Sequence, residues 1–246
     1  MTDFSMLSDY IIGIRRTLHK HPELSGQEFQ TQQLIRNELD KLGIPHRTLH
    51  KTDILAEIAG LQTRPEETAA LPPEKYSKTV LLRADLDALP ITENSDAPYV
   101  SQSPGVMHAC GHDSHTAMLL GAAKLLWDSR YHFSGTVRLM FQPAEETFEG
   151  SRDMIANGIL QGVDGALAFH VSPGKMPVGL VMYNSTGTMM FSVDGFRITI
   201  HGKGGHGAYP HTSIDPINIG VHLHLALQEL IAREADPTHA CVLTVG

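Results

Sequence analysis

Hydrophobic side chains along the first two thirds of the chain follow two different spacings. The stretches Leu7–His21 and Glu28–Leu42 carry apolar residues three or four positions apart, which is typical of amphipathic helices. Short apolar runs typical of buried strands lie at Ile54–Ala59, Thr79–Leu82, Thr136–Phe141 and Gly165–Phe169. Helical patterns at His115–Trp127 and Gly150–Ala156 separate the last three runs. Strands that alternate with helices predict an α/β domain whose mostly parallel sheet is flanked by helices.

The last third of the chain shows a different pattern. Residues Phe191–His201 alternate apolar and polar side chains as a strand does, and a glycine-rich turn follows at Gly202–Gly207. A helical pattern begins at Asp215 and extends to Leu230, and Ala240–Val245 is a further strand-like run. We therefore predict two domains, residues 1–186 and a smaller α+β domain of residues 187–246. The proline-rich and charged stretch Leu61–Lys78 is predicted to be a surface loop.

Composition and charge narrow the class of protein. The 246 residues carry a formal net charge of -8 and show no basic stripe that would neutralise phosphates, so a nucleic-acid partner is not expected. Two cysteines, Cys110 and Cys241, do not make a disulfide framework and favour a reducing compartment. No apolar run approaches the length of a membrane span, and no secretory signal is visible at the start. We predict a cytoplasmic globular protein with no membrane partner.

The candidate chemistry begins with a dense polar cluster at Met107–Thr116. Cys110 and His112 stand two residues apart, and a thiolate with a neutral imidazole is a ligand pair that zinc prefers. Gly111 between them permits a sharp backbone bend. An apolar helical run follows, and the dipole of that helix is expected to favour the thiolate. The cluster predicts a metal site; the competing interpretation is a polar loop with an incidental cysteine.

Polar side chains also follow three of the predicted strands. In chain order they are Asp85 and Asp87, Glu145 and Glu146, and His170. Because ligands bind at the carboxyl ends of parallel strands, these side chains should converge beside Cys110 and His112. Two adjacent buried carboxylates are costly without a cation, so one glutamate is expected to bind a metal while the other acts as general base. One of the two aspartates is expected to orient a ligand histidine.

Three motifs together resemble one branch of a known family. Met107–Asp113, Phe141–Glu146 and Gly202–His211 are similar, in this order, to the hippurate hydrolase and indole-acetyl-amino-acid hydrolase branch of the aminoacylase/carboxypeptidase superfamily of two-metal amidohydrolases. The similarity extends from Arg16–Leu24 to Asp236–Pro237. It implies a hydrolase that cleaves the amide bond of N-acyl amino acids, with an aroyl or acetyl group, by a metal-activated water. The implied cofactors are two divalent metal ions, zinc or manganese.

The resemblance also implies roles for individual residues. Glu145 matches the general base of the family, and His206 matches a histidine that reaches across from a lid domain to polarise the scissile carbonyl in a second subunit. The residues that match metal ligands are Cys110, His112, Glu146 and His170. Because the lid pairs two subunits in the family, we expect a homodimer through residues 187–246. The expected substrates are small N-acyl amino acids or short peptide-like molecules.

The chain departs from the family pattern at three places. Ser114 stands where many relatives have glycine, and Thr147–Glu149 replaces a glycine-rich run. Full-length relatives continue beyond the position of Gly246 and supply one more metal-ligating histidine, so we expect a truncated fragment with an incomplete lid. Such a fragment would be weakly active, or would only bind metal and dimerise. A competing enzyme hypothesis makes Cys110 a nucleophile activated by His112 or His115, but it leaves the two glutamates unexplained.

Overall fold

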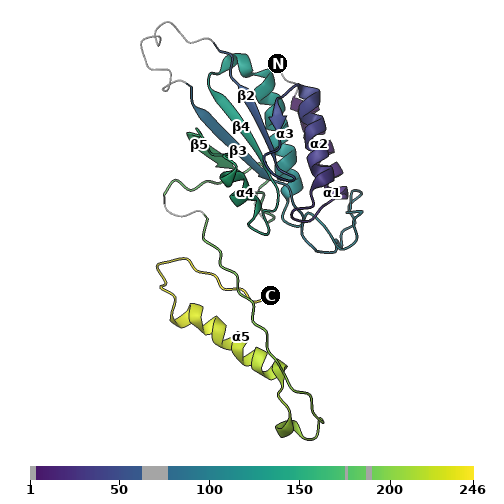
Figure 1. Ribbon diagram of the computed structural model, residues 1–246, viewed down its shortest axis with the longest axis vertical. Coiled ribbons are helices and arrows are strands. Elements are labelled where there is room, and N and C mark those ends of the chain that lie inside the picture. The colour runs from purple at the N-terminus through teal and green to yellow at the C-terminus, as the bar shows by residue number, and fades with distance from the viewer. Residues whose placement is uncertain (1–3, 63–76, 175–176, 187–189) are drawn as a thin grey trace. The chain divides into compact units, whose positions relative to one another are not determined.

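The computed structural model describes residues 4–62, 77–174, 177–186 and 190–246. The chain divides into two compact units, Met1–Met176 and Pro177–Gly246 (Figure 1). The domain border expected between residues 186 and 187 falls inside the second unit. The loop expected at Leu61–Lys78 lies mostly outside the described residues.

The long helices of the first unit form where the sequence has an amphipathic or apolar helical pattern. They are α1 at Phe4–Lys20, α2 at Phe29–Leu42 and α3 at His112–Asp128. α2 ends at Gly43, whose φ of 74° is the left-handed conformation that commonly closes a helix. α3 begins directly after Gly111, whose φ of 86° is accessible to glycine at little cost. A short 3-10 turn, η3 at Arg130–His132, and α4 at Gly150–Ala156 follow.

Among the described residues, five strands form one sheet in the order β1-β2-β4-β3-β5. Their bounds are His46–Arg47 (β1), Ile54–Ala59 (β2), Thr79–Asp85 (β3), Thr136–Gln142 (β4) and Gly165–Ala168 (β5). β3 pairs in parallel with β4 and β5, whereas β2 is antiparallel to both β1 and β4. Only β2 therefore runs against the other strands of this sheet, and the predicted mostly parallel sheet is confirmed.

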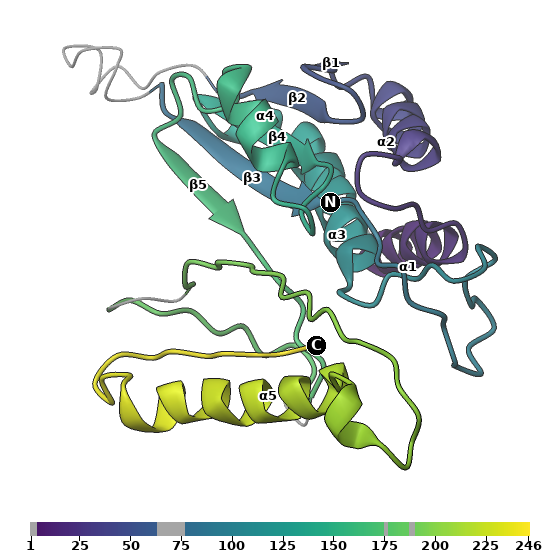
Figure 2. The same ribbon diagram turned by 60° about the horizontal axis from the view of Figure 1, so that its bottom comes forward.

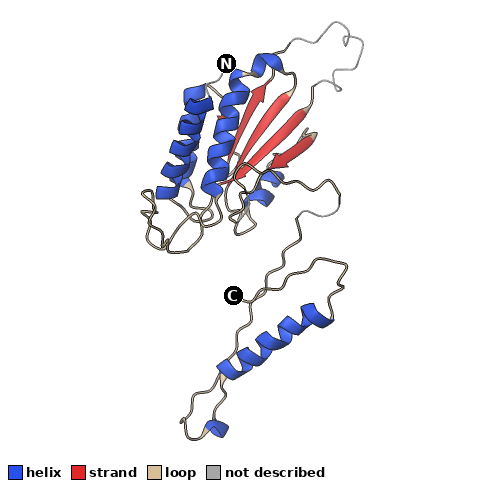
Figure 3. Ribbon diagram, turned by 180° about the vertical axis from the view of Figure 1, so that it is seen from behind, coloured by secondary structure: helices blue, strands red, loops and turns tan. Residues whose placement is uncertain are grey.

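Helices cover both faces of this sheet, as Figures 2 and 3 show. On one face, side chains of β2, β3 and β4 pack against α2 and α3 around Ile35, Leu120 and Phe141. On the other face, alternate residues of the same strands pack against Met154 of α4 and the nearby Ile159. Successive side chains of a strand point to opposite faces, so apolar runs in the sequence bury both sides of the sheet.

The second unit is built around one long helix. α5 spans Pro216–Arg233, after the 3-10 turn η4 at Pro210–Thr212. The side chain of Asp215 accepts hydrogen bonds from the N–H groups of Ile217 (2.9 Å) and Asn218 (3.3 Å), so the predicted helix start is confirmed.

The strands predicted at Phe191–His201 and Ala240–Val245 are not formed, and that prediction was wrong. Apolar alternation sets which side chains share a face, but a strand also needs a neighbouring backbone to pair with. In the described part of the second unit, the pairing consists of the bridge between Lys203 and Ile214. Across all the described residues, no helix combines the length and apolar character needed to cross a membrane.

Candidate metal centre

The candidate site lies where β3, β4 and β5 end, beside the first turn of α3. Asp85 is the last residue of β3 and lies in register with Gln142, the last residue of β4. The other side chains that the sequence singled out lie next to the ends of these elements. They are Cys110 and His112 at the start of α3, Glu145 and Glu146 after β4, and His170 after β5. The topology therefore gathers residues that lie far apart in the sequence at one edge of the sheet.

His112 is fully buried and is oriented by Asp87. Its Nδ1 donates a hydrogen bond of 3.2 Å to Asp87 Oδ1. Asp87 also accepts from the Ser25 hydroxyl (2.6 Å) and from the Glu146 N–H (3.0 Å). Burial alone would raise the pKa of Asp87, but its hydrogen bonds to His112, Ser25 and Glu146 lower it to about 2. The fixed ring leaves Nε2 of His112 buried and without a hydrogen-bond partner among the described residues.

Cys110 and His170 meet beside this imidazole. Cys110 Sγ lies 3.3 Å from His170 Nε2, and the ring centroids of His170 and His112 are 6.2 Å apart. One potential ligand atom from each of the three residues lies within 4.8 Å of the others. A tight sulfur and imidazole group of this kind suits zinc.

The surroundings of Cys110 disfavour its thiolate, contrary to the expectation from the sequence. Burial, followed by the negative charge of Glu146, raises the pKa of the Cys110 thiol to about 12. Burial and nearby carboxylates therefore both oppose a thiolate at Cys110, which lies two residues before the first residue of α3. A bound cation would reverse this balance, because metal coordination deprotonates a thiol.

Glu145 and Glu146 have different surroundings. Glu146 Oε1 is buried without a hydrogen-bond partner and lies 3.8 Å from His112 Nε2. Glu145 Oε2 lies 3.9 Å from the same nitrogen, and its Oε1 lies 4.0 Å from Arg83 Nη2. Burial, with the nearby charge of Asp85, raises the pKa of Glu145. Glu146 thus offers a buried ligand atom, whereas Glu145 is a carboxylate suited to accept a proton.

Glu28, which sequence reasoning missed, holds the loop that carries these two glutamates. Its Oε1 accepts from the N–H of Ala144 (2.9 Å) and of Gly26 (2.8 Å), and its Oε2 accepts from the Thr52 hydroxyl (2.7 Å). The Glu28 side chain is fully buried, and Ala144 is 116 residues away in the sequence. A lone glutamate before an amphipathic helix gives no sequence signal of such a role.

The two aspartates serve different histidines. Asp87 contacts His112, whereas Asp85 Oδ1 lies 2.6 Å from Nδ1 of His115. Asp85 Oδ2 lies 2.9 Å from Arg83 Nη1 and 3.7 Å from His112 Nε2. Burial alone would raise the pKa of Asp85, but the His115 hydrogen bond and the charge of Arg83 hold it below its ordinary value.

These residues fit a divalent metal. Burial would lower the pKa of His112, but the hydrogen bond to Asp87 and the charges of Asp85, Asp87 and Glu145 raise it, which shows how negative the surroundings are. Buried polar atoms without partners are costly, and here two of them, His112 Nε2 and Glu146 Oε1, lie 3.8 Å apart. His112 also belongs to a second group, with Glu145 and Glu146, whose potential ligand atoms lie within 4.8 Å of one another.

The competing hypothesis of a cysteine nucleophile is not favoured by these contacts. His115, one of its two suggested activators, uses Nδ1 on Asp85 and Nε2 on the N–H of Val171. The other, His112, directs its Nε2 toward carboxylates at 3.7–3.9 Å. Neither ring is therefore placed to act as the base that removes the proton of the Cys110 thiol.

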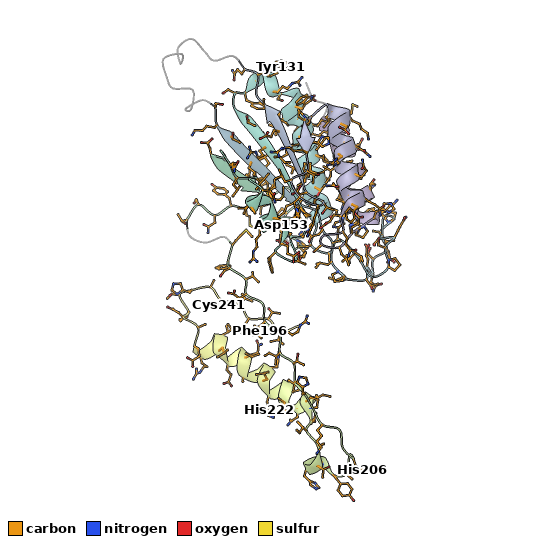
Figure 4. The ribbon with its side chains drawn as sticks, in the orientation of Figure 1. Tyr131, Asp153, Phe196, His206, His222 and Cys241 are labelled. Carbon is orange, nitrogen blue, oxygen red and sulfur yellow. The ribbon has the colours of Figure 1, made fainter. Side chains whose placement is uncertain are left out.

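His206 belongs to the second unit and lies near η4 (Figure 4). Its Nδ1 accepts a hydrogen bond of 3.2 Å from the Ala208 N–H, and its ring packs 5.4 Å from that of Tyr209 between centroids. In the neutral ring the proton is therefore on Nε2, which can donate a hydrogen bond.

Comparison with known proteins finds a matching family and similar sequences. A family model described as peptidase family M20/M25/M40 matches residues 81–238. The chain is 44% identical over 245 residues to the N-acetyl-L-cysteine deacetylase of Bacillus subtilis, covering 99% of this chain and 55% of that protein. It is 43% identical over 243 residues to the N-acyl-L-amino acid amidohydrolase of Geobacillus stearothermophilus, covering 96% of this chain and 60% of that protein.

A solved structure is similar at the level of the fold as well. The Bacillus subtilis YXEP protein, described as a dinuclear metal-binding peptidase, is 40% identical with a TM-score of 0.62. The match covers 70% of this chain and 45% of that structure. The chain thus spans 55–60% of the length of the two curated relatives above.

Proposed function

The chain belongs to peptidase family M20/M25/M40, and on that premise we propose that it hydrolyses the amide bond of N-acyl amino acids with bound divalent metals. The observation that carries the proposal is the pair of buried, unpartnered atoms, His112 Nε2 and Glu146 Oε1, 3.8 Å apart. They lie beside Cys110 and His170 at the carboxyl end of the sheet. The two curated relatives named above supply the substrate class, because both names describe the removal of acyl groups from amino acids.

Cys110, His112, Glu146 and His170 are the residues that would hold two divalent ions. Sulfur and imidazole donors favour zinc, while the carboxylates would also accept manganese. When bound, such ions act as Lewis acids that polarise the scissile carbonyl and lower the pKa of water. Asp87 contributes by orienting His112, whose Nδ1 it binds at 3.2 Å.

Glu145 is the proposed general base. It removes a proton from the attacking water and later returns that proton to the leaving nitrogen. Its raised pKa matches this task better than the low pKa of Asp87 does. Arg83 lies between two carboxylates, with Nη2 4.0 Å from Glu145 Oε1 and Nη1 2.9 Å from Asp85 Oδ2.

His206 is the proposed donor to the substrate carbonyl. Its neutral ring carries the proton on Nε2, since Nδ1 accepts from the Ala208 N–H. The resemblance to the amidohydrolase branch supports its action in the active site of a second copy, within a homodimer paired through residues 187–246. Both described cysteines, Cys110 and Cys241, are unpaired thiols, which supports a cytoplasmic enzyme.

Paired variants of the two glutamates test this proposal. We expect Glu145→Gln to keep the metal content of the wild type but to lower kcat by ~10²–10⁴, the usual scale for a lost general base. Glu146→Gln should instead lose metal, because it removes a ligand. The measurements are metal content by elemental analysis and cleavage of N-acetyl and N-benzoyl amino acids with added zinc or manganese. If Glu145→Gln loses the metal and Glu146→Gln keeps it, the two roles are reversed.

A chelator provides the second arm of the test. Removing the metal should abolish cleavage, and adding zinc or manganese should restore it. Loss of activity on thiol alkylation in metal-free buffer, without any effect of the chelator, would support the cysteine nucleophile instead.

A further inference from the structure

His170 lies just after an edge strand and is itself exposed. All four residues of β5 are exposed, and β5 pairs with the sheet on one side through β3. A side chain at such a position has few neighbours to hold it. Yet His170 Nε2 lies 3.3 Å from Cys110 Sγ, so the segment after β5 must be fixed by other contacts.

The next residue, Val171, makes those contacts through its backbone. Its carbonyl accepts a hydrogen bond of 2.6 Å from Nδ1 of His170. This bond places the ring proton on Nδ1 and leaves the lone pair of Nε2 directed at the site. The N–H of Val171 donates a bond of 2.9 Å to Nε2 of His115. One peptide segment therefore sets both the position and the tautomer of His170.

His115 can accept that bond because its hydrogen bond to Asp85 fixes the tautomer of the His115 ring. Asp85 lies 2.6 Å from Nδ1 of His115, and both side chains are almost completely buried. Asp85 is ion-paired with Arg83 at 2.9 Å, and Arg83 donates from Nε to Gln142 at 2.9 Å. A carboxylate can only accept, so Nδ1 of His115 must carry the proton and Nε2 must accept. Both nitrogens of His115 are thereby used.

A close approach at Gly111 supports the same docking independently. A Cβ atom at Gly111 would lie 2.4 Å from Cγ2 of Val171, and the φ of Gly111 is 86°. The absence of a side chain there lets the Val171 side chain rest against the backbone between Cys110 and His112. The rings of His115 and His170 also pack at 4.6 Å between centroids in a T-shaped arrangement.

We propose that His115 is a positioning residue: held by Asp85, it tethers the N–H of Val171 and so sets His170 against Cys110. In this assignment Asp85 and His115 are not metal ligands, although their potential ligand atoms and one from His112 lie within 4.8 Å of one another. The inference rests on the proposed function only in taking His170 as a ligand. The tether consists of protein groups alone, so it can be tested without catalysis.

Two substitutions at position 115 distinguish the hydrogen bond to Val171 from the hydrogen bond to Asp85. The Gln side chain places an oxygen near the position of Nε2 and can still accept from Val171, whereas Asn reaches only as far as Nδ1. We expect His115→Asn to speed amide exchange at Val171 by about tenfold or more in the metal-free protein. It should also weaken zinc binding by about 10- to 100-fold, as the loss of a bond that orients a ligand does. His115→Gln should stay near the wild type in both measurements.

Exchange is followed by mass spectrometry on peptides covering residues 165–173, and zinc affinity by competition with a chelating dye. His132→Asn, in the 3-10 turn η3, is the matched control. Unchanged Val171 exchange in His115→Asn would overturn the proposal. Equal loss of zinc in His115→Asn and His115→Gln, with the Val171 amide still protected from exchange, would show instead that His115 is a ligand.

A measurement on the unmodified protein covers the case in which the variants do not fold. Long-range proton–nitrogen NMR of the metal-free chain should show His115 with its proton on Nδ1. A proton on Nε2 would overturn the tether, because that nitrogen could not then accept from Val171. An inactive chain that nevertheless shows the Nδ1 proton and the protected Val171 amide would overturn the proposed function but support the tether.

Discussion

His19 lies in a buried group of charged side chains that the proposed reaction does not use. Its Nδ1 is 2.6 Å from Asp113 Oδ2, and its Nε2 is 3.2 Å from Glu93 Oε1. Arg15 Nε lies 2.9 Å from the same oxygen of Asp113, and the Tyr99 ring packs edge-on against His19. The hydrogen bond to Asp113 raises the pKa of His19, although burial and Arg15 oppose this. The group joins α1 to Asp113 in the first turn of α3.

At the residue scale, we expect His19 to make stability depend on pH. Its folded pKa lies above the unfolded value of 6.5, so its stabilising contribution is complete below that pH. The contribution is lost as the pH rises through the folded pKa. The carboxylates of Asp113 and Glu93 stay ionised over this range because their pKa values are lowered, and His108 stays neutral because burial lowers its pKa to about 4.

Thermal unfolding of the wild type and of His19→Asn checks this expectation. The wild type should be the more stable protein at about pH 6, and its advantage should shrink toward about pH 9. Exposed His132→Asn should show no such trend. An advantage that grows with pH would mean that His19 is bound in its neutral form.

At the scale of elements, the segment between β4 and α4 is fixed by close backbone packing. A Cβ atom at Gly150, the first residue of α4, would lie 1.6 Å from the carbonyl oxygen of Pro143. Ala144 and Phe148 adopt left-handed conformations, with φ of 49° and 60°. The N–H of Gly150 also donates to the Ala144 carbonyl at 3.2 Å. The path that presents Glu145 and Glu146 therefore depends on a glycine outside the site.

We expect Gly150→Ala to destabilise the fold by about 1–3 kcal/mol and to lower metal content, because the backbone must move to admit the methyl group. Gly165→Ala in β5 is the matched control, since nothing lies within 4 Å of its added Cβ. That control should stay within about 0.5 kcal/mol of the wild type. Denaturant unfolding and elemental analysis measure the two effects; equal behaviour of both variants would contradict the packing argument.

At the scale of the whole molecule, the chemistry is divided between the two compact units. The proposed ligands Cys110, His112, Glu146 and His170 all belong to Met1–Met176, whereas His206 belongs to Pro177–Gly246. The second unit exposes large apolar side chains, among them Ile217 (75% exposed) and Leu225 (58% exposed) on α5. Extended apolar exposure of this kind is typical of surfaces that bind another protein chain.

We therefore expect the full chain to self-associate through its second unit. Sedimentation equilibrium should find a dimer for residues 1–246 and a monomer for residues 1–174. The shorter chain should still bind zinc with the same stoichiometry, because it keeps all four proposed ligands. A monomeric full chain, or a dimer that survives the truncation, would contradict the assignment of residues 187–246 as the pairing domain.

The sequence by itself determined most helices and strands and the residues of the candidate centre. Periodicity predicted β2 at Ile54–Ala59 and α4 at Gly150–Ala156 with the bounds that the structure has. Helices and strands depend on neighbours within a few residues, so the local spacing of apolar residues is enough to predict them. The strand-end positions of Asp85, Glu145 and His170 were also sufficient to predict that they converge, because the ends of parallel strands meet at one edge.

Only the tertiary structure decided which partner each of these residues has. It paired Asp87 with His112 and Asp85 with His115, and it placed Glu28 under a loop 116 residues away. It also raised the pKa of Cys110, where the helix position alone suggested the opposite, and it left Phe191–His201 without a strand partner. Hydrogen bonds, burial and strand pairing join groups that are distant in the chain. Their outcome is set by packing in three dimensions, which no local pattern of side chains records.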